Sequence, residues 1–162
     1  MFVYYFAHIP LPFAQLTESF TNHPDLWLPG NISEAYAAAA SLAPTGGTGA
    51  NLFIEVGPIG QGGGSITFPF RIDAAVTGAL FTHLEADLEI SELGPGHAQL
   101  TLRGSYRALK RSQDGSAEGL RHRAVEAITK GIVERVASRL AGAAVAAPLS
   151  RAHAVTEASH TG

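Results

Sequence analysis

LRHRAVEAITKGIVERVASRL, residues 120–140, is the longest helical pattern in the chain. Apolar residues recur in it at four-residue steps and charged residues cover the other faces, which is the pattern of an amphipathic helix. The apolar stripe consists of Leu120, Ala124, Ile128, Ile132, Val136 and Leu140. A helix from Glu118 to Ala141 would be roughly 36 Å long at 1.5 Å per residue. Its stripe therefore predicts a long concave surface for the helix to rest on.

Three strand patterns precede this helix in addition to a hairpin that is described below. Phe2–Ile9 is a run of β-branched and aromatic residues that is apolar on both faces, which predicts a well-covered strand. Apolar residues alternate in Asn51–Val56 and in Ile66–Ile72, whereas Phe53 falls out of phase, which predicts an exposed apolar position. Pro69 lacks a backbone N–H and so predicts an edge, a bulge or an outward-pointing nitrogen.

Two short helices are expected after the first strand. The first covers residues 12–22, with Pro12 at its entry, and the second covers Ile32–Leu42. The segment Trp27–Gly30 contains a Pro-Gly pair and predicts a break between them. Asn31 and Glu34 have the spacing of a capping box, which places the start of the second helix there.

The best-specified local feature is a β-hairpin on either side of Gly94-Pro95-Gly96. Apolar and polar residues alternate strictly in both arms, so even-numbered residues must pair with even-numbered ones to keep one face apolar. A three-residue loop meets that requirement. It predicts Leu88 opposite Leu102 and Asp87 opposite Arg103.

Composition predicts one α+β domain. The chain has 162 residues, of which 46% are hydrophobic and 15% charged, and it contains no cysteine. There is ample material for a single core, and disulfides and thiolate metal sites are excluded. Gly142 and Pro148 predict the end of the long helix. We therefore expect a domain at residues 1–147 and a flexible C-terminal tail at 148–162.

Charge and hydropathy restrict the expected location of the protein and the kinds of partner that it binds. No run approaches the ~20 apolar residues of a membrane span, and Met1–His8 lacks the positive start of a secretory signal. A cytoplasmic location is expected. The net charge is −3, and acids flank the densest basic group at residues 103–123. A nucleic-acid partner is therefore not expected.

The element order resembles the START-like, or helix-grip, superfamily (SRPBCC), which includes birch-pollen-allergen-like and polyketide cyclase/dehydrase-like proteins. More narrowly, it resembles an uncharacterised bacterial branch. The segments that carry the resemblance are Trp27–Pro29, Leu84–Ile90, Leu100–Tyr106 and Arg121–Ala127. The resemblance implies a curved antiparallel sheet that grips the C-terminal helix. It also implies a cavity between them that often holds a lipid, a sterol or an aromatic polyketide.

No motif of catalysis, metal binding or nucleotide binding stands out. The seven histidines show no His-x-x-x-His spacing. The glycine-rich segments 46–49 and 60–64 lack the Gly-Lys-Ser/Thr of a P-loop. There is no Gly-x-Ser-x-Gly elbow. We therefore assign no catalytic residue, no metal and no cofactor.

Aromatic residues are the more informative set. They are either ordinary core or the lining of a hydrophobic pocket. Small residues between sheet and helix, at 104, 124, 127 and 131, either leave room for a ligand or let the helix lie closer. The predicted ligand-contacting residues are Trp27, Tyr36, Phe68, Phe70, Phe81, Leu102, Tyr106, Ala124, Ile128 and Ile132.

Three functions remain open from the sequence. The first is non-catalytic binding or transport of a small hydrophobic molecule beneath the long helix. The second is a polyketide cyclase-like or dehydratase-like enzyme, with His8, His83 or Tyr106 as candidate acid–base groups. The third is a ligand-free interaction or regulatory protein, with a homodimer left open and Phe53 as a candidate contact.

Overall fold

A computed structural model describes the backbone of residues 1–41, 50–75, 79–107 and 115–158. Within the last range it describes the side chains of residues 118–146. The sequence also predicts a loop at residues 44–49 and a polar turn at residues 110–117; the loop and most of the turn lie outside the described residues.

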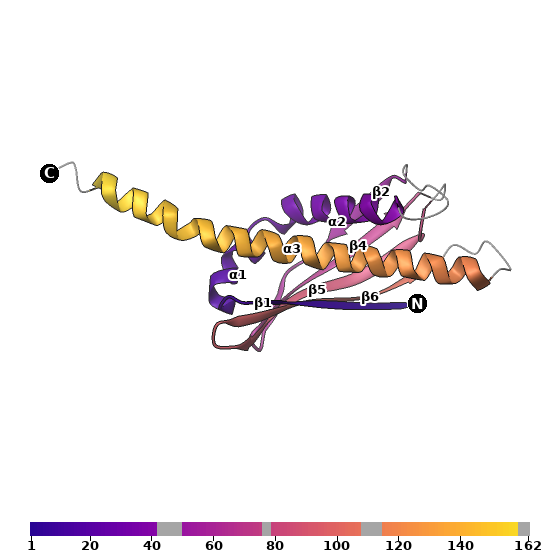
Figure 1. The fold of residues 1–162 in the computed structure, drawn as a ribbon, viewed down its shortest axis with the longest axis horizontal. Helices are drawn as coiled ribbons and strands as arrows, with labels where there is room; N and C mark the ends of the chain where they lie inside the picture. Colours follow the sequence, from indigo (N-terminus) through magenta and orange to yellow (C-terminus); the bar gives the residue numbers. More distant parts are fainter. Residues whose placement is uncertain (42–49, 76–78, 108–114, 159–162) are drawn as a thin grey trace.

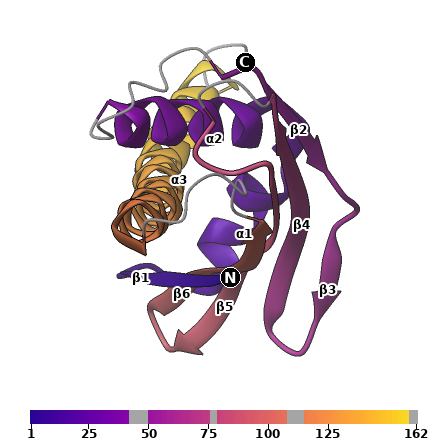
Figure 2. The ribbon, with the colours of Figure 1, turned by 90° about the vertical axis from the view of Figure 1, so that its right-hand side faces the viewer.

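In the part of the chain that the structure describes, the strands form one antiparallel sheet of six, in the order β1-β6-β5-β4-β2, with β3 also paired to β4. The sheet is strongly curved, and the helices lie within its concave side (Figure 2). The strands are β1 (Phe2–Ile9), β2 (Leu52–Val56), β3 (Gly60–Gly62), β4 (Ser65–Ala74), β5 (His83–Gly94) and β6 (His97–Arg107).

The described residues also form three helices: α1 (Phe13–Thr21), α2 (Pro24–Ala40) and α3 (Gly115–Ala158). The long α3 runs along the sheet beside α2, and its C-terminal part extends past the sheet (Figure 1). Gly131 allows the two helices to approach closely, since an added Cβ there would lie 3.2 Å from the Ala35 Cβ. The α+β class and the helix-grip arrangement predicted from the sequence are confirmed.

The predicted break at Trp27–Gly30 is wrong, because α2 runs without interruption from Pro24 to Ala40. Pro24 occupies the first turn, where a backbone N–H has no partner within the helix, so its missing N–H costs no hydrogen bond. Pro29 removes only one backbone hydrogen bond of the helix. Leu28 and Ile32, on either side of the expected break, are fully buried, so their packing outweighs the local signal. Asn31 does not cap the helix; its side-chain amide donates to the Trp27 carbonyl at 2.8 Å.

The apolar stripe of α3 is buried over most of its length but not at its start. Ile128, Ile132, Val136 and Leu140 are fully buried, whereas Leu120 is 49% exposed. The reason is geometric: a step of four residues advances about 40° beyond a full turn, so such a row drifts around the helix. The buried face is completed by Val125 and Val133, which lie off the predicted row.

The predicted end of α3 near Gly142 is also wrong, because the helix continues to Ala158. Residues 141–147 are mostly alanine, which has the highest helix propensity and offsets the single glycine. The helix also passes through Pro148. The flexible tail at 148–162 and the domain boundary before it remain predictions.

The outer face of β1 corrects the prediction of a well-covered strand. Val3 and Ile9 are buried against the core, but Phe2, Tyr4 and Phe6 are 85%, 61% and 46% exposed. In the described residues the helices pack against only one face of this antiparallel sheet, so the opposite face meets solvent. The apolar residues on both faces of β1 therefore do not mean that both faces are buried.

The hairpin register is confirmed: Leu88 pairs with Leu102 and Asp87 with Arg103. The connection differs from the predicted three-residue loop, because Gly94 pairs with His97 and leaves a two-residue turn. A two-residue turn alone would pair even with odd residues. An irregularity between Glu92 and Gly94 inserts one extra residue and restores the even-to-even register.

Pro69 lies in the interior strand β4, and its backbone faces the side of that strand on which β2 and β3 pair. On that side β4 pairs with β2 as far as Phe70 and with β3 from Thr67 onward. Pro69 falls between the two, and its carbonyl accepts from the Gly57 N–H at 2.7 Å. Where one such bond forms in an antiparallel ladder the reciprocal bond normally forms too, but Pro69 has no N–H to donate to the Gly57 carbonyl. The pairing of β4 with β2 stops at Phe70, so the missing N–H marks an interruption of the ladder rather than the predicted outward-pointing nitrogen. The short strand β3 was not predicted.

Candidate functional site

The predicted ligand-contacting residues all lie in or against one hydrophobic core between the sheet and the helices. Most of them are almost completely buried, with exposed fractions of 4% or less. Trp27 and Ala124 are partly buried and pack against the core from its margin. Whether these residues contact a ligand remains a prediction. The nearly buried members are Tyr36, Phe68, Phe70, Phe81, Leu102, Tyr106, Ile128 and Ile132.

The aromatic members divide into separate contacts rather than facing one open space. Trp27 meets Phe68 edge-on, with ring centroids 6.4 Å apart, and Phe20 lies 4.7 Å from Phe68. Tyr36 meets Phe81 edge-on at 5.8 Å. These rings pack against one another and occupy the interior at these positions. Phe20 was not predicted from the sequence as a member of this cluster. The signal was available, because Phe13, Leu16 and Phe20 recur at three- and four-residue steps, which predict the buried face of α1.

A pocket of about 290 Å³ lies beside α3, between that helix and β1. Val3 and Tyr5 contribute from the strand, and Ala127 and Thr129 from the helix. Ala127 is one of the small residues singled out in the sequence, and its short side chain leaves space at this point. The Thr129 hydroxyl donates to the Val125 carbonyl at 2.9 Å, so it is already satisfied.

The rim of this α3 pocket is polar. Glu126 and Lys130 line it from α3, and Tyr4 lines it from β1. Lys130 also lies 3.7 Å from Glu134, whose carboxylate accepts a long hydrogen bond from the Tyr5 hydroxyl at 3.5 Å. The pocket thus combines apolar walls with hydrogen-bonding groups at its mouth, as small-molecule sites do.

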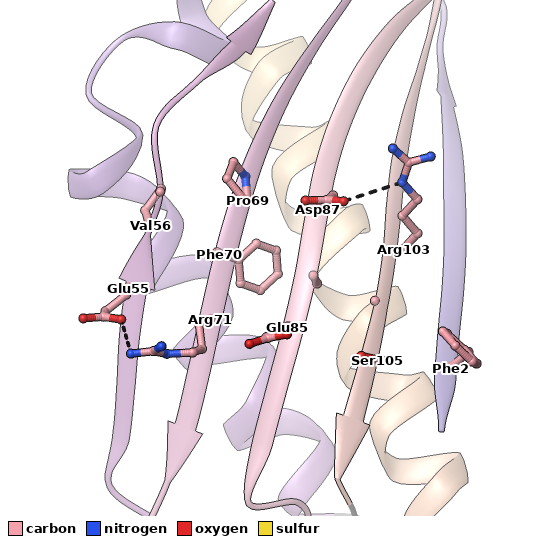
Figure 3. Close-up of a pocket in the computed structure, with 13 residues that line it drawn as sticks. Phe2, Glu55, Val56, Pro69, Phe70, Arg71, Glu85, Asp87, Arg103 and Ser105 are labelled. Carbon is pink, nitrogen blue, oxygen red and sulfur yellow. Dashed lines mark hydrogen bonds and ion pairs between the residues drawn. The ribbon is translucent and has the colours of Figure 1, made fainter.

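A larger depression of about 840 Å³ lies on the opposite, outer face of the sheet. Its side chains come from β2, β4, β5, β6 and β1, and the helices lie behind the sheet in this view (Figure 3). Phe70 is the one predicted ligand-contacting residue among those that line it.

Ion pairs link the charged side chains of the outer depression, where acids outnumber the arginines. Arg71 pairs with Glu55 and lies 3.1 Å from Asp73. Arg103 lies 3.7 Å from both Asp87 and Glu89. Each arginine therefore sits between acids, and the exposed setting of these pairs makes each worth about 0–1 kcal/mol. The predicted Asp87–Arg103 pair is confirmed, with the small energetic role expected of it.

His83 belongs to the same outer face. Its Nδ1 lies 2.6 Å from Asp73 and its Nε2 lies 3.1 Å from Glu85. The hydrogen bond with Asp73 raises the pKa of His83 above its usual value, and Glu85 adds to this rise. The same bond lowers the pKa of Asp73. Two carboxylates thus hold the imidazole in place, which stabilises its cationic form.

Tyr106 and His122 meet at the start of the described part of α3. The Tyr106 hydroxyl lies 2.8 Å from His122 Nδ1, and His122 Nε2 lies 3.3 Å from Glu126. Burial raises the pKa of the Tyr106 hydroxyl above its usual value, and the charges of Glu118 and Glu126 add to the rise. Neither Tyr106 nor His122 lines either of the two pockets above.

The three acid–base candidates named from the sequence do not converge. Tyr106 faces the core, whereas His83 is held on the outer face by Asp73 and Glu85. His8 is exposed on the outer face of β1, with its ring 5.4 Å from that of Phe6. Within the described ranges, no three metal-ligating side chains gather as a metal site, and no helix is long and apolar enough to cross a membrane.

No family model and no curated protein matches this sequence. Crystal structures with a similar fold include the Zhui aromatase/cyclase from Streptomyces sp. R1128, at 12% identity and a TM-score of 0.45, over 86% of this chain and 93% of that chain. Ara h 8.0201 matches at 12% identity and a TM-score of 0.36, over 85% and 98% of the two chains. TTHA0849 from Thermus thermophilus matches at 14% identity and a TM-score of 0.37, over 85% and 98%.

At these identities and TM-scores, the likenesses carry no argument about ligand or activity. The architecture shows the fold alone. One curved antiparallel sheet holds a long C-terminal helix, with two short helices after the first strand, which is the helix-grip arrangement.

Proposed function

We propose that this protein binds a small hydrophobic molecule without transforming it, in the pocket between β1 and α3. The observation that carries the proposal is the 290 Å³ opening at the margin of the core, where Ala127 leaves space against Val3 and Tyr5. Binding sites for small molecules occupy ~300–1,000 Å³, so the volume of this pocket lies just below the lower end of that range.

The chemistry of the pocket favours a ligand with an apolar body and one polar group. Val3, Ala127 and the ring of Tyr5 supply the apolar walls, and Lys130 and Glu126 supply the polar rim. A pocket of this volume suits one or two rings or a short acyl chain. A complete lipid, a sterol or a polycyclic polyketide requires core side chains to move as well. Such a larger ligand would then contact core residues such as Phe68 and Ile128.

The test fills the pocket. Ala127→Leu places an isobutyl group in the opening, and Ser138→Leu adds the same group at an exposed position of α3 as a matched control. Binding of the apolar probe 1-anilinonaphthalene-8-sulfonate is followed by fluorescence, and native mass spectrometry of the purified protein reports any retained ligand. We expect Ala127→Leu to weaken probe binding at least tenfold and Ser138→Leu to leave it unchanged.

Two results would contradict the proposal. One is equal probe affinity in the wild type and in a folded Ala127→Leu variant, with folding checked by circular dichroism. The other is the absence of any bound molecule in native spectra together with no probe binding. The milder Ala127→Val change gives an intermediate loss of affinity if the leucine variant is unstable.

A polyketide cyclase-like or dehydratase-like enzyme is the second candidate, favoured by the chain of contacts Tyr106–His122–Glu126. Such a chain is able to relay a proton between a phenol and a carboxylate. Turnover of a poly-β-keto thioester by the wild type, detected as loss of water in mass spectra, and its loss in Tyr106→Phe support this candidate. Equal turnover in both removes Tyr106 from consideration.

The third function, a ligand-free interaction protein, keeps Phe53 as a candidate contact. Phe53 is 71% exposed, as its position out of phase predicted. Its cross-strand neighbour is Asp73, so it stands beside charged rather than apolar groups. The cytoplasmic location stays a prediction from the sequence.

A further inference from the structure

The first strand forms one edge of the sheet. Its only strand partner in the described residues is β6. Natural proteins protect such edges with charged residues, prolines, bulges or very short strands. β1 has none of these: its eight residues, FVYYFAHI, pair with β6 in continuous register and carry no acid, lysine, arginine or proline.

The backbone groups at this edge can be assigned from one pair of hydrogen bonds. The backbone nitrogen of Met1 donates to the Tyr106 carbonyl, and the Tyr106 N–H donates to the Met1 carbonyl. In an antiparallel ladder, pairs that exchange both bonds alternate with pairs that exchange none. Val3 and Tyr5 therefore bond to β6, while the N–H and C=O groups of Phe2, Tyr4, Phe6 and His8 point away from it.

The same even-numbered residues also carry the exposed aromatic side chains. Phe2, Tyr4 and Phe6 are 85%, 61% and 46% exposed. The Tyr4 and Phe6 rings lie 6.1 Å apart, and those of Phe6 and His8 lie 5.4 Å apart, so they form a continuous ladder. A fully buried aromatic side chain removes 150–250 Å² from solvent. The three exposed rings therefore offer on the order of 400 Å² per copy.

We propose that two copies of this chain pair through β1, antiparallel and about a two-fold axis, to form one continuous sheet. Even-numbered residues then face even-numbered residues of the partner, and each supplies the backbone groups that the other lacks. The aromatic ladders lie side by side on the outer face, where cross-strand aromatic pairs stabilise a sheet. Such an interface is isologous, because the same strand is both donor and acceptor.

A second copy fits this edge better than an unrelated strand for two reasons. The two ladders together supply at most about 800 Å², half of the ~1,600 Å² of a standard interface, and the paired strand backbones add to this area. The flank of α3 beside the edge carries Glu126, Lys130 and Glu134, so its charges largely cancel and two copies meet without strong repulsion. The opposite edge strand, β2, carries Glu55 and lacks an aromatic ladder.

The test measures mass in solution. Sedimentation equilibrium compares the wild type with Phe6→Lys and with the matched control Phe53→Lys, an exposed phenylalanine on β2. We expect a concentration-dependent dimer for the wild type, a dissociation constant raised at least tenfold by Phe6→Lys, and no change with Phe53→Lys. Phe6 does not line the α3 pocket, so this outcome is independent of ligand binding. His8→Lys, at an exposed residue of the same ladder that does not line the α3 pocket, serves as a second edge variant if Phe6→Lys fails to fold.

The absence of cysteine allows a second, direct measurement. A nitroxide label at Arg103→Cys, on β6 beside Tyr4 but outside the aromatic ladder, reports the distance between the two copies, and a label at Phe53→Cys is its control. Paired strands lie about 4.8 Å apart and three such steps separate the two β6 strands, so labels at Arg103→Cys should be separated by roughly 30 Å or less, with a longer distance at Phe53→Cys. A monomer at every concentration overturns the proposal. A dimer that dissociates with Phe53→Lys but not with Phe6→Lys, or that shows the short distance only at Phe53→Cys, also overturns it.

Discussion

The hydroxyl oxygen of Tyr106 lies 2.8 Å from Nδ1 of His122, and the two rings stack with centroids 6.0 Å apart. The contact joins the end of β6 to α3. It therefore couples the sheet to the helix that it grips, at a point where Tyr106 is only 3% exposed.

Alkaline titration should reveal this contact. Burial raises the pKa of the Tyr106 hydroxyl, so the folded protein holds that proton more tightly than the unfolded chain does. The resulting stability is fully present below the ordinary tyrosine pKa of about 10 and is lost as the pH rises through the higher folded value. Tyr106→Phe should remove one late component from the tyrosinate absorbance, while the control Tyr4→Phe leaves that component in place. An unchanged late component in Tyr106→Phe would contradict the assignment.

The His83–Asp73 pair predicts a pH-dependent stability. The pKa of His83 is raised, so its contribution is present below the ordinary histidine value of about 6.5 and is lost as the pH rises through the folded value. The pKa of Asp73 is lowered, so its contribution is lost as the pH falls through that lower value. His83→Gln should therefore lower the melting temperature more at about pH 5.5 than at about pH 9. In a double-mutant cycle, Asp73→Asn should remove most of that difference; additive effects would show that the two groups act independently.

Gly104 should tolerate no side chain. An added Cβ would lie 2.5 Å from the Glu85 carbonyl oxygen and 2.7 Å from the Ala86 Cβ, so the paired strands would have to separate. Gly104→Ala should lower the free energy of unfolding by about 1–3 kcal/mol or more. Gly119→Ala is the control, because no atom lies within 4 Å of its added Cβ, and it should stabilise α3 by roughly 0.5–1 kcal/mol. Urea unfolding measures both, and equal effects would contradict the clash.

Arg139 should stabilise the junction of α1, α2 and α3. Its guanidinium carbon lies 4.5 Å from the centre of the Trp27 ring, and its Nη1 donates to the Ser19 carbonyl at 3.2 Å. Arg139→Leu removes both contacts and should cost about 1–3 kcal/mol. Trp27 is the only tryptophan, so its fluorescence should also shift. Arg123→Leu, at an exposed position of α3, is the control. An equal loss of stability in that variant would show that the loss of a positive charge, rather than the contacts of Arg139, causes the effect.

The fold was largely predictable because its signals are local and periodic. Alternation in the hairpin was enough to set Leu88 against Leu102, and the register survived although the turn differed. The errors came from rules that tertiary packing overrides. Pro29 lies within α2 because Leu28 and Ile32 bury their side chains on either side of it.

The candidate site was less predictable. The predicted aromatic residues do gather between sheet and helices, but sequence periodicity cannot measure the space that they leave. The alternatives left open for the small residues have different outcomes at different positions: Gly131 brings α3 close to Ala35, whereas Ala127 lines a pocket. Which outcome applies depends on what lies opposite each residue, and only the folded structure defines that.

The sequence by itself determined the element types, the hairpin register and the long amphipathic helix, because each depends on residues that are neighbours along the chain. Only the tertiary structure decided that the outer face of β1 is exposed and that the interior is packed around Phe68. It also decided that the pocket between β1 and α3 lies at the margin of the hydrophobic core. These features depend on which surfaces meet across the fold, and side-chain volumes on opposing elements fix them.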